Sequence, residues 1–147
     1  VGENDNIGNI QYYKGVSIGS IIEQVPAITE TLTANSLKPW SPADVRGSRD
    51  GSNNLTITWE RRTRYSGPLL DGLDTVPLNE ESEAYEVDIL DTNGDVVRTI
   101  DSLSSETATY SAANQTSDGF TPGDSIDVIV YQLSSLVGRG FGAEATI

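Results

Sequence analysis

Three neighbouring arginines, Arg61, Arg62 and Arg64, form the group of side chains in this sequence best suited to binding an anion. A guanidinium holds a carboxylate or a phosphate through two parallel hydrogen bonds. On a strand, Arg62 and Arg64 would share one face and Arg61 would take the other. This surface could bind a saccharide or phosphate of bacterial lipopolysaccharide or capsule.

Pairing of these arginines with acids is the interpretation that we favour, because charge pairs between strands are common in sheets. The pairs could form within the chain or between subunits. The acids concerned enter the neighbouring strand: Glu80, Glu81, Glu83 and Glu86.

The glycine-rich stretch Gly138-Arg139-Gly140-Phe141-Gly142 lies near the end of the chain. So many glycines predict a turn or bulge between the last two strands, with Arg139 and Phe141 presented at the loop. Loops of a sandwich gather at its ends, where binding modules carry their contacts. Aromatic candidates for sugar stacking or subunit contact are Tyr12, Tyr13, Tyr65, Phe120 and Phe141. The residues predicted to contact a receptor or subunit are Arg61, Arg62, Arg64, Tyr65, Arg139 and Phe141.

Three groups of acids could be mistaken for catalytic or metal sites. Glu80-Glu81-x-Glu83 and Asp71-x-x-Asp74 lack the cleft and apolar pocket that glycosidase carboxylates need, so a solvated acidic loop is expected. The stretch 91–95 (DTNGD) has alternating oxygen ligands, but Ser102 stands where a calcium loop carries its bidentate Glu. We predict a hairpin turn there, and no metal or cofactor.

The residue types that are missing exclude several functions. Without Cys or His the chain has no thiol nucleophile, no zinc ribbon and no Ser-His-Asp triad. A sequence pI near 4.1 argues against nucleic acid as a partner. A non-enzymatic protein is therefore expected. Because the sequence contains no Met, we expect these 147 residues to be a piece of a larger polypeptide.

The net charge of -13 is unevenly distributed along the chain. Residues 1–37 hold four acids and one Lys, and residues 38–70 hold six basic residues and three acids. Residues 71–147 hold fifteen acids and two arginines, a net charge of -13 in that segment alone. The basic stretch beside an acidic remainder indicates electrostatic self-complementarity of the chain, complementary neighbours in an assembly, or simply a solvated acidic surface.

The elements that would position these residues are strands, because apolar side chains alternate with polar ones. Expected strands are Asn54–Arg62, Ala84–Asp91, Asp95–Ile100, Ala108–Ala112, Ser125–Ser134 and Glu144–Ile147. Pro39 and Pro42 make Trp40–Arg46 an edge strand or a lead-in. The segment between Ala84 and Ile100 contains Asn93-Gly94, a strong hairpin signal.

Short strands with such spacing predict an all-β fold, a fibronectin type III-like (Ig-like) β-sandwich over residues 38–147. Trp59, Tyr85 and Tyr110 are expected in its core. Residues 1–37 are predicted to form an extended N-terminal arm or linker, or a hairpin that docks elsewhere.

Four strings also resemble a known family: SLKPWSPADVRGSRDGSNNLTITWERRTR, VPLNEESEAYEVDIL, VVRTI and VYQLSSLVGRGFGAEATI. They are similar to the C-terminal region of the tail-tip, or host-specificity, proteins of siphophages and gene transfer agents. The resemblance covers roughly Tyr12–Ile147 and is densest in Lys38–Arg64, Pro77–Leu90 and Val130–Ile147.

The resemblance implies a structural and adhesion domain at the distal tail tip of a virion, preceded by a hub region. It implies a homotrimer within the tail, contacts with other tail-tip subunits, and a host glycan or outer-membrane receptor as a further partner. The alternative is a carbohydrate-binding module of a secreted bacterial glycan-degrading enzyme.

Overall fold

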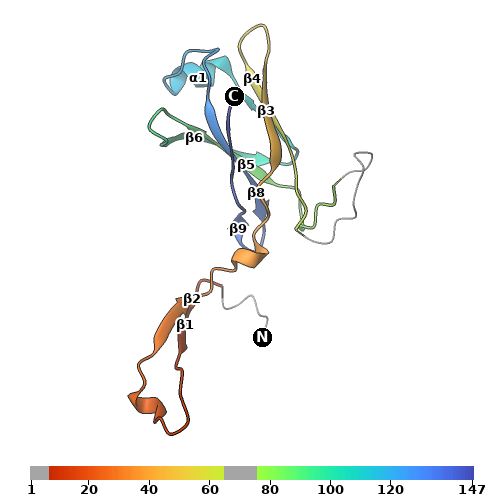
Figure 1. Ribbon diagram of the computed structural model, residues 1–147. Helices are drawn as coiled ribbons and strands as arrows, with labels where there is room; N and C mark the ends of the chain where they lie inside the picture. The colour runs from red at the N-terminus through yellow and green to blue at the C-terminus, as the bar shows by residue number, and fades with distance from the viewer. Residues whose placement is uncertain (1–6, 65–75) are drawn as a thin grey trace. The chain divides into compact units, whose positions relative to one another are not determined.

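The computed structural model of this chain describes residues 7–64 and 76–147 (Figure 1). The chain divides into two compact units, Val1–Leu37 and Lys38–Ile147. Within the described residues, no helix is long and apolar enough to cross a membrane. That the first unit follows a hub region stays a prediction.

The first unit is built on a β-hairpin. Strands β1 (Ile10–Tyr13) and β2 (Ile28–Thr31) pair antiparallel. The 3-10 turn η2 (Ile22–Gln24) follows β1, and the 3-10 turn η3 (Asn35–Leu37) follows β2. None of its described residues is buried. A two-stranded hairpin without a buried face is marginally stable in water, because little apolar surface offsets the ordering of its backbone.

The second unit is a sandwich of two antiparallel sheets (Figure 1). One sheet has the order β3-β4-β7: β3 (Ala43–Arg49), β4 (Leu55–Glu60) and β7 (Thr107–Tyr110). The other has the order β10-β8-β5-β6: β10 (Ala143–Thr146), β8 (Asp127–Ser134), β5 (Tyr85–Leu90) and β6 (Val96–Leu103). The short strand β9 (Gly138–Arg139) also pairs with β8. The edge position expected for the proline-flanked strand is confirmed, because β3 is the outer strand of its sheet.

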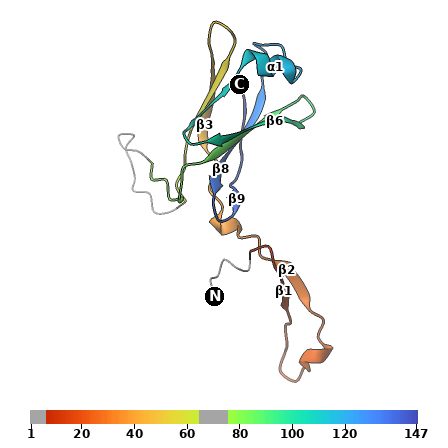
Figure 2. The ribbon, with the colours of Figure 1, turned by 180° about the vertical axis from the view of Figure 1, so that it is seen from behind.

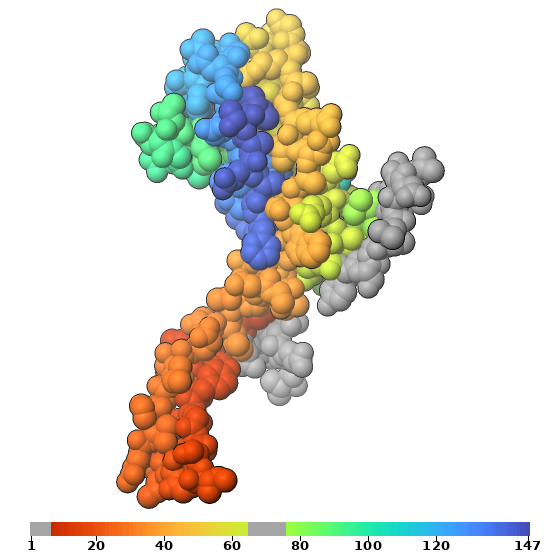
Figure 3. All heavy atoms as spheres, viewed as in Figure 1, coloured from red at the N-terminus to blue at the C-terminus, as the bar shows by residue number. Residues whose placement is uncertain are grey.

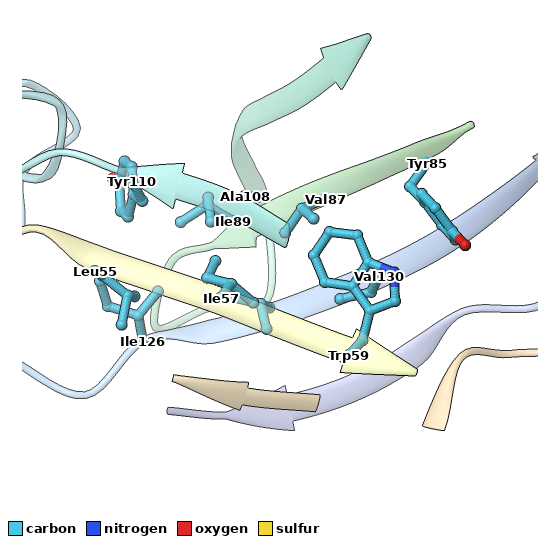
Figure 4. Packing of buried hydrophobic residues seen from close by; sticks show 11 residues of the cluster. Leu55, Ile57, Trp59, Tyr85, Val87, Ile89, Ala108, Tyr110, Ile126 and Val130 are labelled. Carbon is cyan, nitrogen blue, oxygen red and sulfur yellow. The ribbon is translucent and has the colours of Figure 1, made fainter. Parts of the chain in front are cut away.

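Alternating side chains from both sheets form the core. Figure 4 shows residues of β4 and β7 meeting residues of β5 and β8 between the sheets. Trp59 and Tyr85 pack edge-to-face with ring centroids 5.3 Å apart. Trp59, Tyr85 and Tyr110 are all buried, which confirms the expected core aromatics. Each such ring removes a large apolar area from water, the main driving force for folding.

The turn between β5 and β6 is the predicted hairpin. The Asp91 carboxylate accepts hydrogen bonds from the backbone N–H groups of Asn93 and Asp95, at 2.8 and 2.9 Å. These bonds hold the pKa of Asp91 below its ordinary value. Gly94 has a φ of +87°, a left-handed conformation that glycine adopts without strain. The carboxylate that resembled a calcium ligand thus stabilises its own turn.

The connection from β7 to β8 differs from the sequence prediction. Strand β7 ends at Tyr110, and the residues that follow form α1 (Ala112–Ser117) instead of strand and turn. The Ser111 hydroxyl caps this helix by accepting from the N–H of Asn114. A helix of six residues, fewer than two turns, is too short to produce a recognisable 3.6-residue period, so its alanines resembled strand residues.

Helix α1 lies beside the turn between β3 and β4, as Figure 2 shows from behind. The buried Gln115 side chain explains the contact, because its amide donates to the backbone oxygens of Asn53 and Tyr110. Arg49 donates to the Gln115 side-chain oxygen at 3.0 Å. All polar atoms of this buried amide therefore have partners.

The two sheets approach each other where β10 lies along β3 (Figure 3). A Cβ on Gly47 would lie 2.9 Å from the Cβ of Ile147, so only glycine allows this approach. The backbone of Ile147 exchanges hydrogen bonds with Ile126, at 2.7 and 2.9 Å. This end of the chain is thereby fixed to the sandwich.

Candidate functional site

The arginine-rich segment after β4 is not a strand, because β4 ends at Glu60. The expected alternation of Arg61, Arg62 and Arg64 on two faces is therefore wrong. Pairing with acids is confirmed for two of them. Arg61 lies 3.1 Å from Glu83, and Arg64 lies 2.9 Å from Glu80.

Arg139 takes a different place from the one expected. It lies in β9, and its guanidinium reaches across the outer face of the sheet to the carboxylates of Glu86 and Asp88. The same guanidinium stands 4.6 Å from the centre of the Tyr131 ring. Hydrogen bonding to Asp88, and then to Glu86, raises the pKa of Arg139 above its ordinary value. A receptor contact by Arg139 would have to compete with these bonds.

The glycine-rich stretch forms the predicted bulge. Leu133 pairs with Arg139 and Val130 pairs with Ala143, so three steps along β8 match four steps along the facing strand. The extra residue is accommodated at the glycines between β9 and β10.

Gly140 and Gly142 are both required because neighbouring atoms approach their backbone too closely for a side chain to fit. A Cβ on Gly140 would lie 2.6 Å from the carbonyl oxygen of Pro39, and one on Gly142 would lie 2.6 Å from Cγ2 of Ile129. Between them, Phe141 donates its N–H to the Pro39 carbonyl at 3.0 Å. The bulge thus joins the last strands to the segment that precedes β3.

Two cation–ring pairs flank the buried Pro39, and we name their four side chains the Trp40–Phe141 surface: Lys38, Trp40, Arg62 and Phe141. Arg62 stands over the Trp40 ring with its guanidinium carbon 5.0 Å from the ring centre. Lys38 stands over the Phe141 ring at 5.8 Å. The two aromatic side chains are 47% and 46% exposed. Pro39, between Lys38 and Trp40, is buried and holds the segment in place.

The cations of this surface differ from the others in the chain. The other seven of the nine basic side chains all form hydrogen bonds or ion pairs: Lys14, Arg46, Arg49, Arg61, Arg64, Arg98 and Arg139. Lys38 and Arg62 have no hydrogen-bond or ion-pair partner among residues 7–64 and 76–147. Two uncommitted cations in a chain with 22 acids are a feature that folding alone does not require.

The predicted contact residues therefore fall into two groups, those on the Trp40–Phe141 surface and those paired with acids. Arg62 and Phe141 belong to the two cation–ring pairs that flank Pro39, whereas Arg61, Arg64 and Arg139 form ion pairs with acids. Tyr65 lies outside the described residues. Trp40 and Lys38 were missed, although a tryptophan between two prolines on a lead-in segment is a signal that could have suggested an exposed ring.

The other aromatic candidates are also divided. Phe120 packs against the core, and its ring meets Tyr110 edge-to-face at 6.4 Å, so its expected exposure is wrong. Tyr12 and Tyr13 in β1 are exposed, as expected. They belong to the first unit and are not part of the Trp40–Phe141 surface.

The acidic side chains form no metal cluster among the described residues. Glu80 and Glu83 are paired with arginines, and Glu81 accepts a hydrogen bond from Ser135. Asp71 and Asp74 lie outside the described residues. An open groove beside the β5–β6 turn contains Asp127 and Glu144 but none of the predicted contact residues.

The fold is an all-β sandwich that resembles fibronectin type III domains. It is similar to domains d3-d4 of the rat CD45 extracellular region, with a TM-score of 0.50 and 13% identity over 97% of this chain. The chain spans 64% of the length of that structure. The FN5 domain of Drosophila Lar matches with a TM-score of 0.41 and 15% identity, over 74% of this chain and 95% of that domain. At these identities the likeness concerns the fold alone.

No protein-family model matches the chain, and neither does any curated protein. Since one fold serves many functions, a specific role for this chain has to be argued from its surfaces.

Proposed function

We propose that this chain is a non-enzymatic contact module of a phage-like tail tip, part of a baseplate hub or fibre protein. The observation that carries the contact function is the Trp40–Phe141 surface, where exposed aromatic rings and uncommitted cations lie together. Tryptophan and arginine are the side chains most enriched among residues that dominate binding energy. The tail-tip context rests on the four sequence strings alone.

The proposal places the protein at the distal end of a virion tail, as a homotrimer together with other tail-tip subunits. The module contributes to assembly of the tip and to recognition of the host surface. The loop-borne position of its surface suits either task, because a rigid sandwich can hold variable contacts at its end.

Immunolabelling of intact particles tests this location. Gold-labelled antibody raised against residues 38–147 should bind at the distal tail end in negative-stain micrographs. Antibody pre-absorbed with the purified chain is the control. Label confined to the capsid or the tail shaft, or the absence of this chain from purified particles, would contradict the proposal. Quantitative mass spectrometry of purified tails should give three copies for each tip.

A second candidate, a carbohydrate-binding module of a secreted glycan-degrading enzyme, is favoured by the same exposed aromatic rings. The parent gene separates the two. A tail hub domain encoded upstream supports the tail-tip proposal, and a glycan hydrolase domain there supports the alternative.

A further inference from the structure

From the Trp40–Phe141 surface we infer a binding site for a carboxylated sugar, such as a uronate or sialate residue of an acidic glycan. The inference deepens the proposed contact function and rests on it. It assigns a chemical class of ligand to a surface composed of Lys38, Trp40, Arg62 and Phe141.

The charge of the ligand follows from the uncommitted cations. The chain carries 22 acids and nine basic residues, so acids to neutralise Lys38 and Arg62 are plentiful. Seven basic side chains have found hydrogen-bond or ion-pair partners within the described residues, and these two have not. An anionic group of another molecule could accept the paired hydrogen bonds that the Arg62 guanidinium can donate.

The shape of the ligand follows from the two rings. Trp40 and Phe141 are about half exposed, and the ring surface that Arg62 and Lys38 leave uncovered is flat and apolar. The C–H face of a pyranose ring is a flat apolar partner for such a platform. Inorganic phosphate has the charge but no apolar face, and a neutral sugar has the face but no charge. A carboxylated sugar has both.

The backbone holds the surface in place before any ligand arrives. Phe141 donates to the carbonyl of the buried Pro39, and Gly140 fits directly against Pro39. The register between β3 and β4 pairs Ala43 with Glu60, which brings the segments that carry Trp40 and Arg62 together. A surface ordered in advance loses little conformational freedom when it binds.

Calorimetric titration of the full chain with acidic oligosaccharides tests the inference. The probes are tetramers of galacturonate, glucuronate and sialate, each compared with its methyl ester, and inorganic phosphate alone. At least one acidic tetramer should bind, and its ester should bind at least about tenfold more weakly because the carboxylate charge is lost. Phosphate should bind at least about tenfold more weakly than that tetramer, because it cannot stack on the rings. The affinity should fall as salt screens the charges.

Variants locate the binding on the surface. Trp40→Ala and Arg62→Gln should each weaken binding about tenfold or more, a loss typical of residues at the centre of an interface. Arg46→Ala is the matched control, because Arg46 is an exposed arginine of β3 that pairs with Asp44. Of the two tryptophans, Trp40 is exposed and Trp59 is buried. A change in tryptophan fluorescence when the sugar is added to wild type or to Arg62→Gln therefore reports on Trp40. Unfolding curves establish that each variant is folded.

The inference is overturned if none of the three acidic tetramers binds, or if the methyl ester binds as tightly as the acid. It is overturned as well if phosphate binds as tightly as the acidic tetramers, or if both surface variants bind the sugar like wild type. It is also overturned if wild type self-associates and Trp40→Ala does not, because the surface would then join copies of this chain. Failure here leaves the tail-tip proposal intact if particles label at the tip. Sugar binding without tip labelling would contradict the tail-tip location alone.

Discussion

The guanidinium of Arg139 in β9 donates to both carboxylate oxygens of Asp88 in β5, with nitrogen–oxygen distances of 2.6 and 3.0 Å. Asp88 is 2% exposed although it lies on the outer face of its sheet, and the Thr99 hydroxyl also donates to it at 2.6 Å. The two residues are 51 positions apart in the sequence. Arg139 therefore ties the glycine-rich end of the chain to the central strand β5.

Removal of Arg139 should destabilise the sandwich. Breaking a buried ion pair costs about 3–5 kcal/mol, but Arg139 keeps 41% of its side chain in water, so we expect about 2–3 kcal/mol for Arg139→Ala. Urea unfolding of Arg139→Ala, Asp88→Asn and the double variant gives the coupling energy. Additive effects of the two substitutions would show that the pair contributes nothing.

The glycine bulge should tolerate no side chain. Gly140→Ala places a Cβ 2.6 Å from the Pro39 carbonyl oxygen, and such overpacking costs about 1–3 kcal/mol. Gly51→Ala is the control, because a Cβ there meets nothing within 4 Å. Thermal unfolding of the two variants should give a clearly lower Tm for Gly140→Ala. Equal Tm values would mean that the backbone at Pro39 yields without cost.

Gln132 is a buried amide whose replacement should stabilise the fold. It is 1% exposed, and neither its Nε2 nor its Oε1 has a hydrogen-bond partner among the described residues. An unpaired buried polar group costs about 1–3 kcal/mol, so Gln132→Met, of similar shape, should raise the free energy of unfolding by about 1–2 kcal/mol. Chemical denaturation measures this gain. A loss of stability would indicate that the amide is satisfied by water in solution.

Acid should weaken the contact between Arg98 and Asp118. Arg98 donates to both oxygens of Asp118, and Tyr110 donates to it as well. The hydrogen bond from Arg98 is the main cause of a pKa of Asp118 below its ordinary value. A carboxylate with a lowered folded-state pKa stabilises the fold above the unfolded pKa, and this contribution is lost as the pH falls through the folded pKa.

Asp118→Asn should therefore lower the free energy of unfolding at pH 7 by about 1.5–3 kcal/mol, the worth of hydrogen bonds to a charged group. The difference from wild type should shrink as the pH falls below about 4, the ordinary range of aspartate. Asp95→Asn is the control, because the exposed Asp95 side chain has no hydrogen bond among the described residues. A difference independent of pH would contradict the assignment.

Much of the sandwich could be predicted because its signals are local. Leu55, Ile57 and Trp59 alternate with polar residues. This period of two assigns them to one face of the strand, whatever position the strand takes in its sheet. Asn93-Gly94 likewise predicts its hairpin from two adjacent residues. Helix α1 escaped prediction because a six-residue element has too little pattern to recognise.

The candidate surface was only half predictable. Arg62 and Phe141 were expected to make contacts, but nothing in their neighbourhoods distinguishes Arg62 from Arg61 or Arg64. The distinction arises because Glu80 and Glu83, brought in by the segment before β5, reach Arg64 and Arg61. Trp40 was missed because the residue that joins its segment to the last strands, Phe141, which donates to the carbonyl of Pro39, lies about a hundred residues away in the chain.

By itself the sequence determined most of the sandwich strands, their inward faces, the turn between β5 and β6 and the sign and placement of charge, since these depend on residues close together in the chain. The tertiary structure alone decided which cations are neutralised and which stay available. Ion pairs such as Arg139–Asp88 require the register of several strands at once, and register is a property of the packed sheets. The uncommitted Lys38 and Arg62, over exposed rings, are what that packing left for contact with another molecule.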